Sequence, residues 1–263
     1  MACHESLDEA TLSGICEVVE RDAFTICWQA MLAPPQIRLD TLDDPGYDLV
    51  ERFRQARVEV TMFDLSLDHG IPTVLSVARS AAPGAPAFAF AASSSPSPQT
   101  AVRSSLEELA HTRRYSQWIK EAMVPATHDR SYRDVQGQVD HLNFAADHAN
   151  AAQFEFLFAS EQRRSFDELP DLSTGDPAEE VALLVERIVA VEGRVLAVDV
   201  TSDDVRELGL RVVRAIVPQF HPLHLGHELR ACGGTRLWQV PQSLGYAGAN
   251  PETDGNPTPH PYP

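Results

Sequence analysis

The segment from Asp176 to Val217 constrains the fold more than any other part of the chain. Asp176 precedes Pro177, a pair that favours a helix start because proline fits the first helical position, and the following apolar stripe closes at Gly193. A strand, a short helix and a second strand are then expected over 195–200, 201–208 and 210–217. Because elements that alternate in this way build layered proteins, we expect an α/β fold, a mixed sheet with packed helices.

The first thirty residues predict a long amphipathic helix. Ser6 and Glu9 have the spacing of a capping box, and apolar side chains then recur at helical spacing as far as Ala30. Pro34 and Pro35 should end this helix because proline cannot continue one. Further helices are expected over 47–57 and 99–120, strands over 58–65, 73–78 and within 85–92, and loops with short helices over 125–170.

Composition limits the class of protein. The chain has 263 residues, which is long enough for one large domain or two small ones, and 43% of them are apolar, which is typical of a globular protein. Its 38 acidic and 21 basic residues give a net charge of -17, which would repel a phosphate backbone, so nucleic acid is a poor partner. The first residues show no signal-peptide pattern and no apolar run could span a membrane, so we expect a cytoplasmic location.

The first helix carries a polar stripe. Glu9, Ser13, Glu17 and Arg21 are spaced by four residues, and Glu20 lies three beyond Glu17. Residues three or four apart project from nearly the same face of a helix. For this helix alone, a solvated face with a Glu17–Arg21 ion pair is the favoured interpretation, because such pairs are common on surface helices.

A second polar stripe, Gln99, Arg103 and Glu107, follows the same spacing in the later helix. Taken alone it too fits a solvated face. Together, however, two acidic and basic stripes could hold Mg²⁺ with the carboxylates and phosphate oxygens with the arginines. Neither G-x-x-x-x-G-K-[ST] nor G-x-G-x-x-G is present, so a P-loop or a Rossmann site has no support.

Three histidines, His221, His224 and His227, lie close together in sequence. The proline and glycine between them favour a turn, and no cysteine or carboxylate nearby completes a familiar zinc pattern. Ordinary loop histidines are therefore the favoured interpretation of this segment, ahead of a metal site.

Several motifs, in order along the chain, resemble the YcaO-domain family. The stretch from Ser6 to Ala23 is similar to the E-x-x-E-R-D-A signature helix of that family, and Gln99 to Glu107 is similar to its later Q-x-x-x-R motif. Gly209 to Pro218 resembles the strand before the family's C-terminal loops. Asn256 to Pro263 resembles the P-x-P-x-P terminus of the azoline-forming branch.

The resemblance implies a site for ATP and Mg²⁺. Glu9, Glu17, Glu20 and Glu107 would be magnesium or nucleotide ligands, Arg21 and Arg103 would hold phosphates, and Ser13 and Gln99 would belong to the nucleotide-binding set. The carboxylate of Pro263 would lie beside the reacting peptide and act as a general base. A flexible tail remains an open alternative, since proline-rich termini are often disordered.

The reaction implied is azoline formation in a ribosomally synthesised precursor peptide. A Cys, Ser or Thr side chain attacks the preceding backbone carbonyl, ATP phosphorylates the oxygen of the adduct, and elimination of phosphate leaves a thiazoline or oxazoline. The partners implied are the precursor peptide and an E1-like leader-binding protein, and a homodimer is an open possibility.

Family members also carry, before the signature helix, a segment with a lysine and further glutamates, whereas this chain has few residues there. We therefore expect a YcaO-like fold that is N-terminally truncated. Residues 1–245 would form a partial YcaO-like domain, and residues 246–263 a Pro-rich C-terminal tail of the same domain. Two rival functions stay open, a catalytically inactive scaffold that binds the precursor peptide or a partner enzyme, and a YcaO enzyme that makes thioamides or amidines with an external nucleophile.

Overall fold

The computed structural model describes residues 1–124, 131–246 and 255–263. Its α-helices are α1 (Leu7–Gln29), α2 (Asp44–Gln55), α3 (Pro98–Ala122), α4 (Gln138–Ala146), α5 (Pro177–Ala190), α6 (Asp203–Glu207) and α7 (Arg236–Ser243). Its strands are β1 (Ala2–His4), β2 (Gln36–Ile37), β3 (Glu59–Asp64), β4 (Thr73–Arg79), β5 (Phe88–Ser94), β6 (Arg163–Arg164), β7 (Leu196–Asp199) and β8 (Arg211–Ile216). Short 3-10 helices are η1 (Leu39–Thr41), η2 (His148–Phe158), η3 (Phe166–Glu168) and η4 (His227–Leu229).

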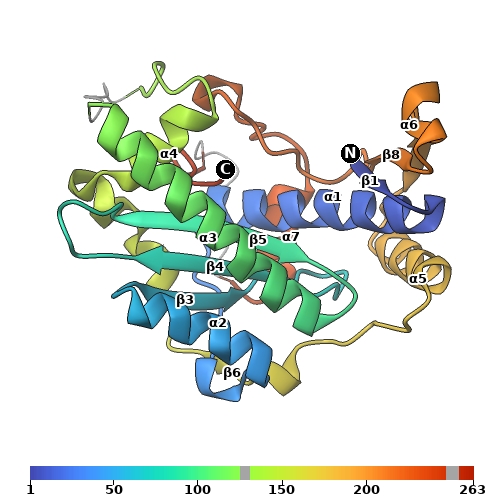
Figure 1. The fold of residues 1–263 in the computed structure, drawn as a ribbon, viewed down its shortest axis with the longest axis horizontal. Helices are drawn as coiled ribbons and strands as arrows, with labels where there is room; N and C mark the ends of the chain where they lie inside the picture. Colours follow the sequence, from blue (N-terminus) through green and yellow to red (C-terminus); the bar gives the residue numbers. More distant parts are fainter. Residues whose placement is uncertain (125–130, 247–254) are drawn as a thin grey trace.

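A five-stranded sheet with the order β5-β4-β3-β2-β6 forms the centre of the molecule (Figure 1). Its pairs are antiparallel except for β2 and β6, which run parallel, so the sheet is mixed, as the sequence predicts. Strand β4 is buried on both faces: Val74 and Ala78 lie in one apolar cluster and Leu75 and Val77 in another. Because successive strand residues point to opposite faces, two layers of helix must cover this sheet.

The covering layers come from different parts of the chain. Helices α2 and α3 pack on one face through Val50, Val102 and Leu106, among other side chains. Helix α1 packs on the other face through Phe24 and Trp28, together with α4 and η2. The sheet is therefore sandwiched between helices on both sides, and α1 and α3 both contact β5.

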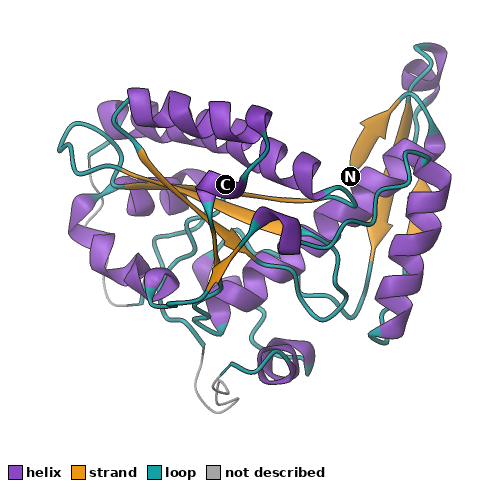
Figure 2. Ribbon diagram, turned by 90° about the horizontal axis from the view of Figure 1, so that it is seen from below, coloured by secondary structure: helices purple, strands orange, loops and turns teal. Residues whose placement is uncertain are grey.

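A second, three-stranded antiparallel sheet has the order β1-β8-β7 and lies at the other end of α1 (Figures 1 and 2). Ile15 and Val19 of α1 pack with Leu184 and Ile188 of α5 and with Ala215 of β8 in a third cluster. Helix α1 thus joins the two sheets. The predicted order of helix, strand, short helix and strand from Asp176 onward is confirmed by α5, β7, α6 and β8.

The capping box predicted at the start of α1 is present, with Ser6 and Glu9 each accepting a hydrogen bond from the other's backbone N–H. The helix ends at Gln29, before the two prolines, as expected. The sequence analysis missed the short strands β1, β2 and β6, whose pairing is set by distant segments. It also missed α7, which contains Pro241.

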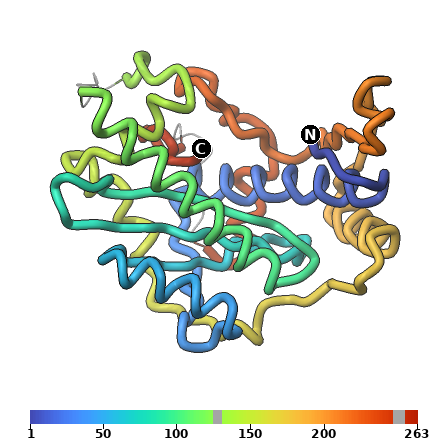
Figure 3. Tube along the Cα trace, viewed as in Figure 1, coloured from blue at the N-terminus to red at the C-terminus, as the bar shows by residue number. Residues whose placement is uncertain are grey.

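The last described segment, residues 255–263, lies along the C-terminal end of α1 and beside α4 (Figure 3). Asn256, Thr258, His260 and Tyr262 are buried. The backbone N–H of Asn256 donates to the Gln29 carbonyl oxygen (2.9 Å), and the Trp28 indole N–H donates to the Thr258 carbonyl oxygen (3.1 Å). The proline-rich end is therefore packed into the protein. Within the described ranges, no helix has the length and apolar character needed to cross a membrane.

Candidate functional site

A polar pocket of about 480 Å³ opens where α1, the end of β5 and the start of α3 meet. Its carboxylates are Glu17 and Glu20 of α1, Glu108 of α3 and Glu180 of α5, and its hydroxyls are those of Ser13, Ser93, Ser94, Ser95, Ser97, Thr100 and Ser104. The oxygen atoms of carboxylate and hydroxyl groups can bind a metal ion. The pocket therefore has the ligand chemistry that a hard divalent cation and its phosphate partners require.

Local sequence explains why these groups converge. The four-residue spacing of Ser13 and Glu17 brings both onto one face of α1, and Glu20 follows three residues later. Helix α3 begins at the pocket because the Ser97 hydroxyl caps it, accepting from the Thr100 backbone N–H, and Pro98 takes the first helical position. The N-terminus of α3 thus lies beside the carboxylates, where its dipole favours negative charge.

Glu20 is the most deeply buried carboxyl group of the pocket. Burial raises its pKa to about 8, and the negative charges of Glu17 and Glu108 add to this effect. Its hydrogen-bond partner is Tyr262, whose hydroxyl donates to Glu20 Oε1 and opposes the rise. A cation bound at this pocket would relieve the same repulsion that protonation of Glu20 relieves.

Glu108 shares this environment. Burial raises its pKa as well, and Glu17 is the next largest cause, while Arg21 opposes the shift. Glu17 therefore lies close enough to disfavour the charge of Glu20 on its own helix and of Glu108 on α3. Perturbed carboxyl groups that converge on a pocket are typical of functional sites.

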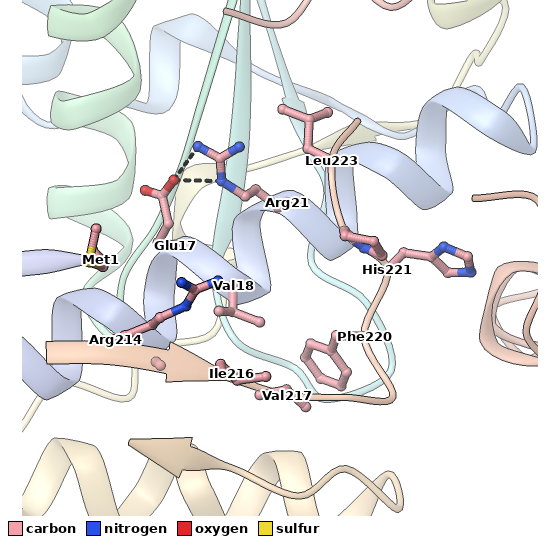
Figure 4. Close-up of a pocket in the computed structure, with 12 residues that line it drawn as sticks. Met1, Glu17, Val18, Arg21, Arg214, Ile216, Val217, Phe220, His221 and Leu223 are labelled. Carbon is pink, nitrogen blue, oxygen red and sulfur yellow. Dashed lines mark hydrogen bonds and ion pairs between the residues drawn. The ribbon is translucent and has the colours of Figure 1, made fainter. Parts of the chain in front are cut away.

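Arg21 lies on the other side of Glu17 and donates through Nε to Glu17 Oε1 (2.6 Å). Figure 4 shows this pair at the edge of a second hollow of about 440 Å³, which Arg214 and the 215–223 segment also line. Glu17 lines both hollows. The Glu17–Arg21 pair is partly exposed, and its guanidinium lines the second hollow, where it could bind an anion.

The structure separates the sequence-predicted residues into two groups. Ser13, Glu17 and Glu20 line the polar pocket, whereas Arg21 lines the second hollow and is hydrogen-bonded to Glu17. Glu9 is held in the capping box of α1, away from that lining. Ser13 contributes to the pocket while its hydroxyl also contacts His4 Nε2 (2.8 Å).

The later stripe lies elsewhere. Arg103 and Glu107 are 4.0 Å apart, with 57% and 56% of their side chains exposed, and neither lines the polar pocket. Glu107 lines a different hollow, between α2 and α3. Gln99 accepts a hydrogen bond from the Ser97 hydroxyl (3.0 Å) and is likewise absent from the pocket lining.

Sequence reasoning missed Glu108, which with Thr100 and Ser104 forms the stripe of α3 that faces α1. This stripe has the same four-residue spacing as the predicted one and lies one residue further along. The four-residue spacing alone therefore predicts both stripes equally well. The orientation of α3 on the sheet decides which of them enters the pocket.

The pocket suits a magnesium–nucleotide complex better than a resident metal. Among the residues that the structure describes, no three His, Cys, Asp or Glu side chains are arranged to hold a metal ion by themselves. Magnesium in nucleotide sites binds through one or two carboxylates and completes its shell with phosphate oxygens and water. The carboxylates of the pocket could supply the protein ligands of such an ion, and phosphate oxygens and water would supply the others.

The three histidines of the 221–227 segment are buried side chains. Within the described ranges, they belong to no group of three or more His, Cys, Asp or Glu side chains that could hold a metal ion. Burial and nearby Arg236 lower the pKa of His221, and burial lowers those of His224 and His227 to about 4. These rings are therefore neutral near pH 7.

Comparison with solved structures supports the fold. A heterocyclase in complex with substrate and cofactor matches 99% of this chain and 32% of its own length, with a TM-score of 0.81 and 22% identity. YcaO from Methanopyrus kandleri bound with AMPPCP and Mg²⁺ matches 84% of this chain and 54% of its own length, with a TM-score of 0.61 and 22% identity. The E. coli microcin synthetase McbBCD complex with pro-MccB17 bound matches 83% and 53%, with a TM-score of 0.55 and 15% identity.

Sequence comparison identifies the family. An uncharacterized protein of Methanothermobacter thermautotrophicus is 29% identical over 245 residues, which are 88% of this chain and 58% of that protein. The chain thus spans between about a third and just under three fifths of the lengths of these four relatives. The family model described as YcaO cyclodehydratase, ATP- and Mg²⁺-binding, matches residues 1–221, so ATP and Mg²⁺ are the ligands of the family. This chain belongs to the YcaO cyclodehydratase family.

Proposed function

We propose that this chain carries out ATP- and Mg²⁺-dependent cyclodehydration of Cys, Ser or Thr residues in a ribosomally synthesised precursor peptide, as part of a multi-component complex. The observation that carries the proposal is the polar pocket between α1 and α3, where the charge of Glu17 helps to raise the pKa values of Glu20 and Glu108. Membership of the YcaO cyclodehydratase family supports the reaction class.

The chemistry requires the loss of one water from each modified residue. The side-chain sulfur or oxygen forms a bond to the preceding carbonyl carbon and gives up its proton to a base. The former carbonyl oxygen must then leave, and oxide or hydroxide is a poor leaving group. ATP supplies a phosphoryl group that lets this oxygen depart as phosphate, and loss of the amide proton completes the ring.

We assign the roles by position. Glu17, Glu20 and Glu108 would share the magnesium–phosphate complex, because they line the pocket. Arg21 would bind phosphate oxygens, since its guanidinium is hydrogen-bonded to Glu17, which lines that pocket. The hydroxyls of Ser13 and of the β5–α3 connection would donate hydrogen bonds to the same oxygens.

The base would be the terminal carboxylate of Pro263. It directly follows Tyr262, whose hydroxyl donates to Glu20 in the pocket. A carboxylate held there could take the proton of the attacking side chain. The buried tail supports this role for the segment 255–263, because a packed segment holds its end in place.

The partners would be the precursor peptide and an E1-like protein that binds its leader, in a cytoplasmic complex. The McbBCD structure, a complex with bound pro-MccB17, supports a multi-protein arrangement. Because the chain spans only part of its relatives, we propose that the remaining part of the family's nucleotide site acts together with it.

The test is a reconstituted reaction that contains this chain, the E1-like protein and a precursor rich in Cys and Ser. We expect ATP consumption that depends on the precursor and a mass loss of one water per modified residue. Peptide binding without turnover would instead establish the scaffold function. A mass change equal to replacement of oxygen by sulfur would establish thioamide formation.

A further inference from the structure

A cluster of histidine rings holds the proline-rich tail. His141 of α4 is fully buried, and its ring stacks on that of His260, with the ring centroids 3.8 Å apart and the planes 12° apart. The ring of His224 meets His260 edge-on at 4.7 Å. Because His260 belongs to the tail and the other two rings do not, the cluster joins the tail to the body of the protein.

His141 connects two backbone segments. Its Nδ1 lies 2.7 Å from the carbonyl oxygen of His260, and its Nε2 lies 2.7 Å from the carbonyl oxygen of Leu225. A carbonyl oxygen only accepts hydrogen bonds, and burial lowers the pKa of His141, so the neutral ring donates its single N–H to one carbonyl at a time. With the proton on Nδ1 the ring holds the tail, whereas with the proton on Nε2 it holds the preceding loop.

The ring of His260 makes two further hydrogen bonds that fix the tail. Its Nε2 donates to the His224 carbonyl oxygen (2.6 Å), and its Nδ1 accepts from the Tyr262 backbone N–H (3.3 Å). Both contacts are satisfied by one neutral tautomer. Tyr262 then packs on Phe24, with the ring centroids 4.4 Å apart, and reaches Glu20 with its hydroxyl. The chain of contacts from α4 thus ends at Tyr262, one residue before Pro263, whose carboxylate is the proposed base.

We infer that His141 is a positioning residue, which fixes the tail through the His260 carbonyl so that the Pro263 carboxylate stays at the reacting peptide. The inference rests on the proposed function, in which that carboxylate is the base. His141 itself lines none of the cavities that contain Glu17, Glu20 or Glu108. It therefore acts on the reaction only through the tail.

Three substitutions separate the two contacts of the ring. The amide nitrogen of asparagine can take the place of Nδ1, and that of glutamine can take the place of Nε2. His141→Asn therefore keeps the donor to the tail, His141→Gln keeps only the donor to Leu225, and His141→Phe keeps the ring without either donor. His148→Gln is the matched control, because His148 Nε2 also contacts backbone carbonyls, of Ala82 and Ala85, away from the tail.

The first readout is hydrogen exchange of the C-terminal peptide 255–263 in the isolated full chain. We expect His141→Gln and His141→Phe to speed exchange at the Tyr262 amide about tenfold, as the loss of one buried hydrogen bond does, and His141→Asn and His148→Gln to leave it near the wild-type rate. Equal effects of Asn and Gln, or no effect of Gln, would overturn the inference. This readout does not depend on catalysis, so it stands even if the proposed reaction fails.

The second readout is kcat in the reconstituted reaction, combined with deletion of Pro263. We expect His141→Gln to lower kcat about tenfold, to leave the affinity for Mg²⁺–AMPPCP unchanged, and to cause no further loss in a chain that already lacks Pro263. Losses that multiply in the double variant would show that His141 acts through general stability, which contradicts a positioning role.

Discussion

At the scale of single residues, the account depends on a buried carboxyl group that holds a proton it would lose in water. This group is Glu20, since burial raises its pKa to about 8 from an ordinary value of 4.5. The folded protein therefore binds this proton more tightly than the unfolded chain does. As pH rises from 4.5 to about 8, the unfolded chain ionises first, and the free energy of unfolding falls.

This gives a pH-dependent prediction for Glu20→Gln, a neutral side chain that can still accept from the Tyr262 hydroxyl. At pH 4.5 the variant and the wild type should have nearly the same free energy of unfolding. As pH rises, the value for the variant should exceed that of the wild type by a growing margin, about 2 kcal/mol by pH 8. Thermal unfolding across this pH range measures the difference. Glu107→Gln, an exposed carboxylate outside the pocket, is the control, and a Glu20→Gln advantage that is constant with pH would contradict the assignment.

Only some of the residues that line the pocket can be predicted from the sequence. The stripe of Glu17, Glu20 and Arg21 is predictable because helical spacing fixes which side chains share a face of α1. Sequence alone cannot predict which of Glu107 and Glu108 enters the pocket, because both belong to polar stripes on neighbouring faces of α3. The packing of α3 against the sheet selects Glu108, and that packing involves residues far away in sequence.

At the scale of elements, α1 is fixed at its C-terminal half by a buried ion pair with α7. Asp22, fully buried, accepts from Arg236 Nε (3.0 Å) and Nη2 (2.8 Å), and its other oxygen accepts from the His221 backbone N–H (2.7 Å). Arg236 also binds Asp68, and its guanidinium stacks over Phe220 at 4.2 Å. One network thus joins α1, the 65–72 turn, α7 and the wall of the second hollow.

We predict that Arg236→Met lowers the free energy of unfolding by about 3 kcal/mol, because it leaves the buried Asp22 carboxylate without its counter-charge. Denaturant unfolding measures the loss. Arg206→Met is the matched control: Arg206 pairs with the partly exposed Asp199 at 3.8 Å, so its removal should cost less than about 1 kcal/mol. Similar losses for the two variants would rule out a buried network of this kind.

Elements also differ in how far sequence determines them. The helix α1 and the strands β3 to β5 follow from capping, periodicity and apolar runs within each segment. Strands β1, β2 and β6 have two or three residues each, and their partners lie far along the chain. Local pattern cannot reveal such pairings, because the stabilising contacts are all tertiary.

At the scale of the whole molecule, the pocket exists because distant segments meet. Helix α1 supplies Glu17 and Glu20, α3 supplies Glu108, and α5 supplies Glu180, while the Tyr262 hydroxyl of the tail donates to Glu20 from outside the lining. The alternating proline pattern predicts an extended tail. Its burial depends on histidine and aromatic contacts with α1 and α4 that the pattern does not encode.

The most direct test of a nucleotide site between α1 and α3 is calorimetric titration of the chain with AMPPCP in the presence and absence of Mg²⁺. We predict Mg²⁺-dependent binding that Glu108→Gln weakens at least about tenfold and that the neighbouring Glu107→Gln leaves unchanged. The two variants differ by one position on the same helix and remove the same charge. If Glu107→Gln weakened binding and Glu108→Gln did not, the nucleotide would not lie in this pocket.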